Sequence, residues 1–123
     1  MPVRVLIVDD HPEFRELARA LLSAKGFEVI GEAGCRAGAL EAAERLRPDA
    51  VLLDLGLGHD SGIDVARELS RTRPRPAVLL VSNGDFRDGE GALEIAGVQG
   101  FLFKWRLARV DLGAYWPDTS APS

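Results

Sequence analysis

The sequence predicts one α/β domain built on a doubly wound, five-stranded parallel sheet. Its 123 residues are 46% hydrophobic, which suits one hydrophobic core and leaves no room for a second folded unit. Short apolar runs of strand length alternate along the chain with longer segments whose apolar residues recur at helical spacing. Five such repeats predict parallel strands that are joined by right-handed crossovers.

The first two repeats are the most regular. Residues 3–8 form an apolar run of strand length, and a helix follows from Pro12, which suits a first helical turn, until Gly26 ends it. The apolar residues of this helix recur at helical spacing: Phe14, Leu17, Ala18, Leu21 and Leu22. We expect a second strand over residues 27–33 and a second helix over residues 36–46.

The third strand ends on an acidic residue. Residues 50–54 are apolar up to Asp54, and such a continuous run is typical of a strand buried on both faces. A glycine-rich loop then leads into a helix over residues 63–71.

The fourth and fifth strands are expected over residues 77–82 and 98–103. The helix between them, over residues 86–96, is the weakest of the set. Gly89 and Gly91 soften it, because each glycine in a helix costs about 1 kcal/mol relative to alanine.

The C-terminal part of the chain is short. We expect a helix over residues 107–112 to complete the domain, which spans residues 1–116. The polar tail, residues 117–123, is expected to be disordered.

Acidic residues stand at the ends of two buried strands. Asp9 and Asp10 follow the first strand, and Asp54 ends the third. Because the carboxyl ends of parallel strands line the ligand crevice of an open α/β sheet, we expect these carboxylates to converge. Crowded like charges repel unless a cation neutralises them, so the sequence predicts a metal site.

Composition excludes several other functions. A net charge of −4 and a pI near 5.1, with scattered arginines, argue against direct nucleic-acid binding. The single cysteine, Cys35, excludes an internal disulfide and a multi-cysteine metal site. The N-terminal apolar run is too short for a signal peptide, and no segment approaches a membrane span, so we expect a cytoplasmic protein without membrane contact.

Polar residues at the strand ends form a set with characteristic spacing: Asp9, Asp10, Asp54, Ser82 and Lys104. This set resembles the receiver domain of bacterial two-component response regulators, and the resemblance covers nearly the whole chain. Asp10 and Asp54 are 44 residues apart, and Ser82 and Lys104 are 22 apart, as in that family. Gly62 stands eight residues after Asp54, also as in the family.

The stretch from Val8 to Arg15 resembles, in particular, receivers that usually carry a helix-turn-helix output domain; the 123 residues contain no such domain. The resemblance implies a flavodoxin-like receiver fold with strand order 2-1-3-4-5. It also implies a module that is not itself an enzyme. Its partners would be a sensor histidine kinase and a downstream protein or fused output domain, and a homodimer is left open.

The resemblance also implies a role for each site residue. Asp54 would accept a phosphoryl group from a phosphohistidine of the kinase. Mg²⁺ would be bound by Asp10, Asp54 and the backbone carbonyl of Gly56, with Asp9 acting through water. Lys104 would pair with Asp54 before phosphorylation and with the phosphoryl oxygens afterwards.

Two further residues would form the switch that the family uses. The Ser82 hydroxyl would move toward the phosphoryl group, and the aromatic ring of Phe101 would rotate inward in concert. Phosphorylation would thereby change a protein-interaction surface.

The sequence departs from the family at four positions near the site. Trp105 replaces the proline that usually follows the lysine, so we expect a trans peptide, because a non-proline cis bond costs about 3 kcal/mol. Gly56 and Gly58 replace a larger side chain and a proline, which predicts an unusually free loop. Asn83 stands where the family prefers a very small residue, and its amide could narrow the entrance to the site.

The departures leave open a pseudo-receiver that serves as a constitutive protein-interaction or dimerisation module. A dehalogenase-like phosphatase would need an aspartate at Gly56, and a dinucleotide-binding fold would need glycines after the first strand. His11, beside Pro12 at a helix start, is expected to be solvated and not a metal ligand.

Overall fold

The first strand shows how the fold begins from alternating apolar side chains. In β1, Arg4–Val8, the side chains of Val5 and Ile7 pack on one face of a sheet, and those of Leu6 and Val8 on the other. All four are fully buried, which requires that helices cover both faces. The structure is a computed structural model that describes residues 2–58, 60–84 and 91–116.

The central sheet confirms the predicted topology. Its five parallel strands lie in the order β2-β1-β3-β6-β7, which is the expected order 2-1-3-4-5. The strands other than β1 are β2 (Glu28–Ala33), β3 (Ala50–Asp54), β6 (Ala77–Ser82) and β7 (Val98–Phe103). Each differs from its predicted bounds by one residue at most.

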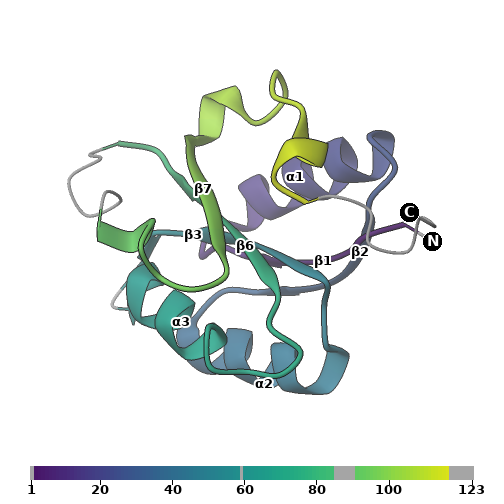
Figure 1. The fold of residues 1–123 in the computed structure, drawn as a ribbon. Coiled ribbons are helices and arrows are strands. Elements are labelled where there is room, and N and C mark those ends of the chain that lie inside the picture. Colours follow the sequence, from purple (N-terminus) through teal and green to yellow (C-terminus); the bar gives the residue numbers. More distant parts are fainter. Residues whose placement is uncertain (1, 59, 85–90, 117–123) are drawn as a thin grey trace.

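In the described part of the chain, the helices α1, α2 and α3 cover the two faces of the sheet (Figure 1). Helix α1, Pro12–Ala24, lies on one face, whereas α2, Arg36–Leu46, and α3, Gly62–Leu69, lie together on the other. The predicted third helix began one residue later and ended two residues later than α3. No helix among the described residues is long and apolar enough to span a bilayer.

The helix predicted over residues 86–96 is only partly within the described residues. Residues 86–90 lie outside them. Gly91 and Ala92 are helical, but residues 93–97 form turns, so the prediction of a helix that continues to Ala96 is wrong. The chain must turn here because Val98 begins β7, and Gly97, at φ 91°, adopts a left-handed conformation that favours glycine.

The helix predicted over residues 107–112 is also wrong. The structure has two 3₁₀ turns instead, η1 over Lys104–Arg106 and η2 over Leu112–Ala114. Asp111 is extended and its carboxylate accepts a hydrogen bond from the Gly113 N–H at 3.0 Å, which starts a new turn where the predicted helix would have continued. The tail, residues 117–123, lies outside the described residues, so its predicted disorder stays a prediction.

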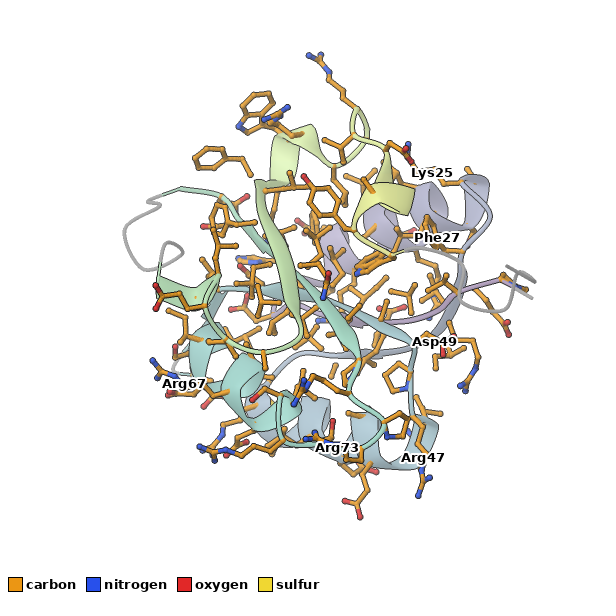
Figure 2. All side chains as sticks on the ribbon, viewed as in Figure 1. Lys25, Phe27, Arg47, Asp49, Arg67 and Arg73 are labelled. Atoms are coloured by element: carbon orange, nitrogen blue, oxygen red, sulfur yellow. The ribbon has the colours of Figure 1, made fainter. Side chains whose placement is uncertain are left out.

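The C-terminal turns pack on the same face as α1. The side chain of Trp116 is buried and meets the ring of Phe27 edge-on at 5.6 Å. The Lys25 ammonium lies 3.4 Å from the carbonyl oxygen of Val110, and Figure 2 shows Lys25 and Phe27 beside these turns. The burial of Leu107, Leu112 and Trp116 anchors the segment without a regular helix.

The glycine-rich loop after β3 contains regular structure that the sequence did not predict. Its described residues form two short antiparallel strands, β4 (Gly56–Leu57) and β5 (Asp60–Ser61). Gly58 has a φ of 64°, which proline cannot adopt. The replacement of proline by glycine therefore permits this hairpin and does not simply loosen the loop.

Candidate metal centre

Three carboxylates converge at the carboxyl ends of β1 and β3. Asp54 is the last residue of β3, while Asp9 and Asp10 follow β1, and these two strands are paired neighbours in the sheet. Oxygen atoms of all three carboxylates and a ring nitrogen of His11 lie within 4.8 Å of one another. Asp9 and Asp54 are buried, with exposures of 1% and 4%.

Lys104 reaches this cluster from the end of β7. Its ammonium Nζ lies 2.6 Å from Asp9 Oδ2 and 3.3 Å from Asp54 Oδ2, and only 7% of its side chain is exposed. The structure therefore pairs Lys104 with Asp54, and it adds a closer contact with Asp9. The Lys104–Trp105 peptide is trans, as predicted. Among the described residues, the one cis peptide bond is Arg73–Pro74.

Burial makes the carboxyl group of Asp54 a weaker acid than usual. Desolvation raises the pKa of its carboxyl above the ordinary value, and the neighbouring charge of Asp9 raises this pKa further. Lys104 and the Gly56 N–H, which donates to Asp54 Oδ1 at 3.2 Å, lower it without reversing the direction. Two buried carboxylates and one ammonium thus leave excess negative charge.

The oxygen atoms of the cluster suit a hard cation. Asp9 Oδ2 and Asp10 Oδ1 are buried, and within the described residues neither accepts a hydrogen bond of acceptable geometry. Asp9 Oδ2 instead forms the ion pair with Lys104. Carboxylate oxygens with unused lone pairs are the ligands that Mg²⁺ and Ca²⁺ prefer, so these residues could hold a divalent metal ion.

Glycines keep the site open and join it to α3. A Cβ on Gly62 would lie 2.2 Å from the carbonyl oxygen of Asp54, so only glycine fits where the chain turns from the hairpin into α3. A Cβ on Gly58 would lie 3.4 Å from Asp10 Oδ2, whereas one on Gly56 would meet nothing within 4 Å. No side chain from either hairpin glycine covers the carboxylates.

The proposed switch residues lie on β6 and β7. Ser82 ends β6 one residue after Val81, which pairs with Asp54, and its hydroxyl accepts a hydrogen bond from the Gly84 N–H at 3.2 Å. The Phe101 ring is half-buried and meets the Phe103 ring edge-on at 5.9 Å. Asn83 is exposed, and its predicted effect on the entrance to the site stays a prediction.

Two residues near the site were not singled out from the sequence. Lys104 Nζ lies 4.3 Å from the centre of the Phe14 ring, which is a cation–π contact. The Arg15 guanidinium donates to the backbone oxygen of Asp9 at 2.6 Å and pairs with Glu32. Both residues belong to the first turns of α1 and to the run from Val8 to Arg15 that resembles the family. That run could have indicated that they lie near the site. Phe14 was missed because its helical spacing assigned it to the core.

Comparison with known proteins gives the same family that the residues suggested. A family model described as "Response regulator receiver domain" matches residues 5–111. The nitrate/nitrite response regulator protein NarP of Escherichia coli is 39% identical over 104 residues, which cover 84% of this chain and 48% of that protein. A protein-glutamate methylesterase/protein-glutamine glutaminase of Rhizobium etli is 40% identical over 101 residues, which cover 81% of this chain and 29% of that protein.

A solved structure agrees with both sequence matches. The signal receiver domain of the putative response regulator NarL from Mycobacterium tuberculosis superposes with a TM-score of 0.72 at 40% identity. The match covers 84% of each chain. The present chain spans about half the length of NarP and less than a third of the methylesterase.

Proposed function

Because this chain belongs to the response regulator receiver domain family, we propose that it is a phosphorylation-activated module of a two-component phosphorelay. Asp54 is the phosphoacceptor, and the phosphoryl donor is a phosphohistidine of a sensor histidine kinase. The observation that carries the proposal is the buried contact of Asp54 with Lys104, beside Asp9 and Asp10.

The chemistry is a transfer between two nucleophiles. A carboxylate oxygen of Asp54 attacks the phosphorus atom, the P–N bond to the kinase histidine breaks, and an acyl phosphate forms on Asp54. The Gly56 N–H and the Lys104 ammonium hold the two carboxylate oxygens in place before the transfer. Lys104 then follows the negative charge onto the phosphoryl oxygens.

Mg²⁺ fits the donor set that the carboxylates provide. Asp10, Asp54 and the backbone carbonyl of Gly56 would bind it directly, and Asp9 would act through water. When bound, Mg²⁺ offsets the charge of the transferring phosphoryl group. The convergence of the three carboxylates and the open space at Gly56 support this assignment.

The output is a change of surface at the end of the sheet. The Ser82 hydroxyl moves from Gly84 toward the phosphoryl group, and the Phe101 ring turns inward. The surface that changes is read by a downstream protein or a fused output domain. The chain regulates and does not itself catalyse a reaction on a separate substrate, and a cytoplasmic location follows from a kinase partner that uses ATP.

Intact mass spectrometry tests the proposal. The chain is incubated with a small phosphodonor, with Mg²⁺ and with EDTA in its place. We expect one phosphoryl mass gain that requires Mg²⁺ and is absent from Asp54→Asn, since an amide is not a nucleophile here. An equal mass gain on Asp54→Asn would contradict the assignment.

One observation favours a second candidate function. Trp105 is 66% exposed and stacks on Phe103 at 6.3 Å, next to the lysine. An exposed tryptophan that stacks on a half-buried phenylalanine suits a constitutive protein-interaction surface, as in a pseudo-receiver. A chain that takes up no phosphoryl group in the experiment above would support this alternative.

A further inference from the structure

The fold gathers four arginines that stand far apart in the sequence. Arg4 begins β1, Arg47 follows α2, and Arg73 and Arg75 lie between α3 and β6. The Arg4 guanidinium donates to the carbonyl oxygen of Arg47 at 3.0 Å. Arg47 and Arg73 line one small pocket, and Figure 2 shows both at the same edge of the molecule. Arg73 and Arg75 both donate to the carbonyl oxygen of Ser70, at 3.3 Å and 2.8 Å. We call these four arginines the arginine surface.

The guanidinium groups of this surface bond to backbone carbonyls and not to carboxylates. Arg4 donates to carbonyl oxygens at the end of α2, and Arg73 and Arg75 donate to one just after α3, where positive charge stabilises a helix. Within the described residues, no carboxylate forms an ion pair with any of the four. Arginines elsewhere in the described chain do pair with carboxylates: Arg15, Arg19, Arg36, Arg45 and Arg67. The arginine surface therefore keeps its positive charge.

Arg47 adopts a backbone conformation that glycine would adopt without strain. Its φ is 48°, and it is the one residue other than glycine with a positive φ in the described ranges. Its side chain is exposed and forms no hydrogen bond or ion pair with the other described residues. Contacts with helix ends thus explain Arg4, Arg73 and Arg75, but not the side chain of Arg47. A strained residue whose side chain adds nothing to the fold points to a function outside it.

An acidic protein segment fits this surface better than a small anion or a nucleic acid does. The pocket between Arg47 and Arg73 has a volume of about 30 Å³, which holds no more than a few water molecules, so a ligand must lie over the surface. Carboxylates border the surface near Arg4, because Glu28 pairs with it in the sheet and Asp49 accepts its backbone N–H at 2.9 Å. These carboxylates and the net charge of −4 disfavour a long phosphate backbone.

We propose that the arginine surface binds an acidic segment of a partner protein. The carboxylates of that segment pair with Arg47 and Arg73, since a guanidinium group can hold a carboxylate through two parallel N–H bonds. The surface lies at the amino ends of β1 and β6, whereas Asp9, Asp10 and Asp54 lie at the carboxyl ends of β1 and β3. A partner bound there leaves the carboxylate cluster accessible, so this proposal goes beyond the proposed function and does not depend on it.

Fluorescence anisotropy of a fluorescein-labelled polyglutamate peptide, titrated with the full chain at low ionic strength, tests the proposal. We expect Arg47→Gly to weaken binding about threefold, and Arg47→Gly together with Arg73→Gln about tenfold, because each exposed ion pair contributes modestly. Added salt should weaken binding to the parent chain. Arg67→Gln is the matched control: it removes the same charge from a residue that pairs with Asp64 elsewhere on the molecule (Figure 2), and it should leave binding unchanged.

Urea unfolding of Arg47→Gly separates a binding role from a structural one. Glycine suits a φ of 48°, so this variant should be as stable as the parent chain or more so. A marked loss of stability would show that Arg47 serves the fold, and the proposal would be overturned. It is also overturned if the parent chain does not bind the peptide, if Arg67→Gln weakens binding as much as Arg47→Gly, or if a DNA duplex binds more tightly. Asp54→Asn should bind the peptide as the parent chain does, so a failure of the phosphoacceptor assignment leaves this proposal intact.

Discussion

At the scale of the residue, the position of Lys104 depends on a neighbour from the other end of the chain. The proline that usually follows this lysine in the family is absent, and the Lys104–Trp105 peptide is trans. The ammonium is held by two carboxylates and by the face of the Phe14 ring. We infer that Phe14 is a positioning residue that helps to keep Lys104 in the site.

A pair of substitutions tests the role of Phe14. A cation–π contact stabilises by about 0.5–2 kcal/mol, so Phe14→Leu should slow phosphorylation by a small phosphodonor about threefold or more. Phe14→Tyr keeps an aromatic face and should restore most of the rate. Initial rates from intact mass measure both; if Phe14→Leu and Phe14→Tyr are equally fast, the ring does not position the lysine.

The raised pKa of Asp54 predicts how stability depends on pH. The folded chain binds the Asp54 proton more tightly than the unfolded chain does, so stability falls as the pH rises from the unfolded to the folded pKa of this group. In EDTA at pH 7, Asp54→Asn should therefore be more stable than the parent chain, by on the order of 1 kcal/mol. The gain should shrink as the pH is lowered toward about 4.

Urea unfolding at several pH values measures this difference. Asp64→Asn is the matched control, because Asp64 lies on the exposed face of α3, with 60% of its side chain accessible, and it should show no such gain. If the parent chain is more stable than Asp54→Asn at pH 7 without metal, the prediction is wrong. The attraction of Lys104 for the Asp54 carboxylate would then outweigh the cost of burying its charge.

At the scale of the element, the hairpin after β3 and the start of α3 form one unit. Gly62 permits the close approach of α3 to the carbonyl of Asp54, and its N–H donates to the Leu55 oxygen at 2.8 Å. A side chain here would displace the backbone that carries the phosphoacceptor. The glycines of this segment therefore differ in what they can tolerate.

Two alanine substitutions separate these roles. Gly62→Ala should destabilise the chain by about 3 kcal/mol or more, because backbone atoms cannot yield as a flexible side chain can. Gly56→Ala, where a Cβ meets nothing within 4 Å, should change the free energy of unfolding by less than about 1 kcal/mol. Denaturant titration compares them, and equal effects would contradict the close approach at Gly62.

The aromatic residues at the end of β7 should respond to a movement of Lys104. Phe103 and Trp105 flank the lysine and stack on each other with an interplanar angle of 9°. If Lys104 moves from Asp9 to the phosphoryl oxygens, the turn η1 must follow it. The exposed indole of Trp105 is then the natural reporter of activation.

Tryptophan fluorescence tests this coupling. A phosphodonor with Mg²⁺ should change the emission of the parent chain and of Trp116→Phe, but not that of Trp105→Phe. The two substitutions separate the fluorescence of Trp105 from that of Trp116, which is buried against Phe27. A signal that survives Trp105→Phe and disappears with Trp116→Phe would place the change on the α1 face.

At the scale of the whole molecule, the spacing of apolar residues correctly predicted the features that depend on residues close together in the sequence. The runs that became β1 and β3 are apolar on both faces, so their burial and parallel pairing were readable, and with them the convergence of Asp9 and Asp54. The roles of Ser82 and Phe101 came from the resemblance to the family and remain predictions, because a single conformation does not test a switch.

Contacts between distant segments were not readable from the sequence. Phe14 has the spacing of a core residue, and only the fold places its ring under Lys104. The C-terminal helix was wrong because Asp111 starts a new turn and because Trp116, outside the apolar repeat that was used, anchors the segment in the core. His11 was expected in solvent, and 56% of its side chain is exposed, but only the fold shows that its Nδ1 also lies 3.1 Å and 3.0 Å from the Asp9 and Asp10 carboxylates.

The central claim is that Asp54 carries the phosphoryl group. The most direct measurement treats the phosphorylated chain with sodium borohydride, which reduces an acyl phosphate on aspartate to homoserine, and locates the change by peptide mapping. The account predicts homoserine at position 54, dependent on Mg²⁺ during phosphorylation. Homoserine at Asp9 or Asp10, or a phosphoryl group that borohydride does not remove, would contradict it.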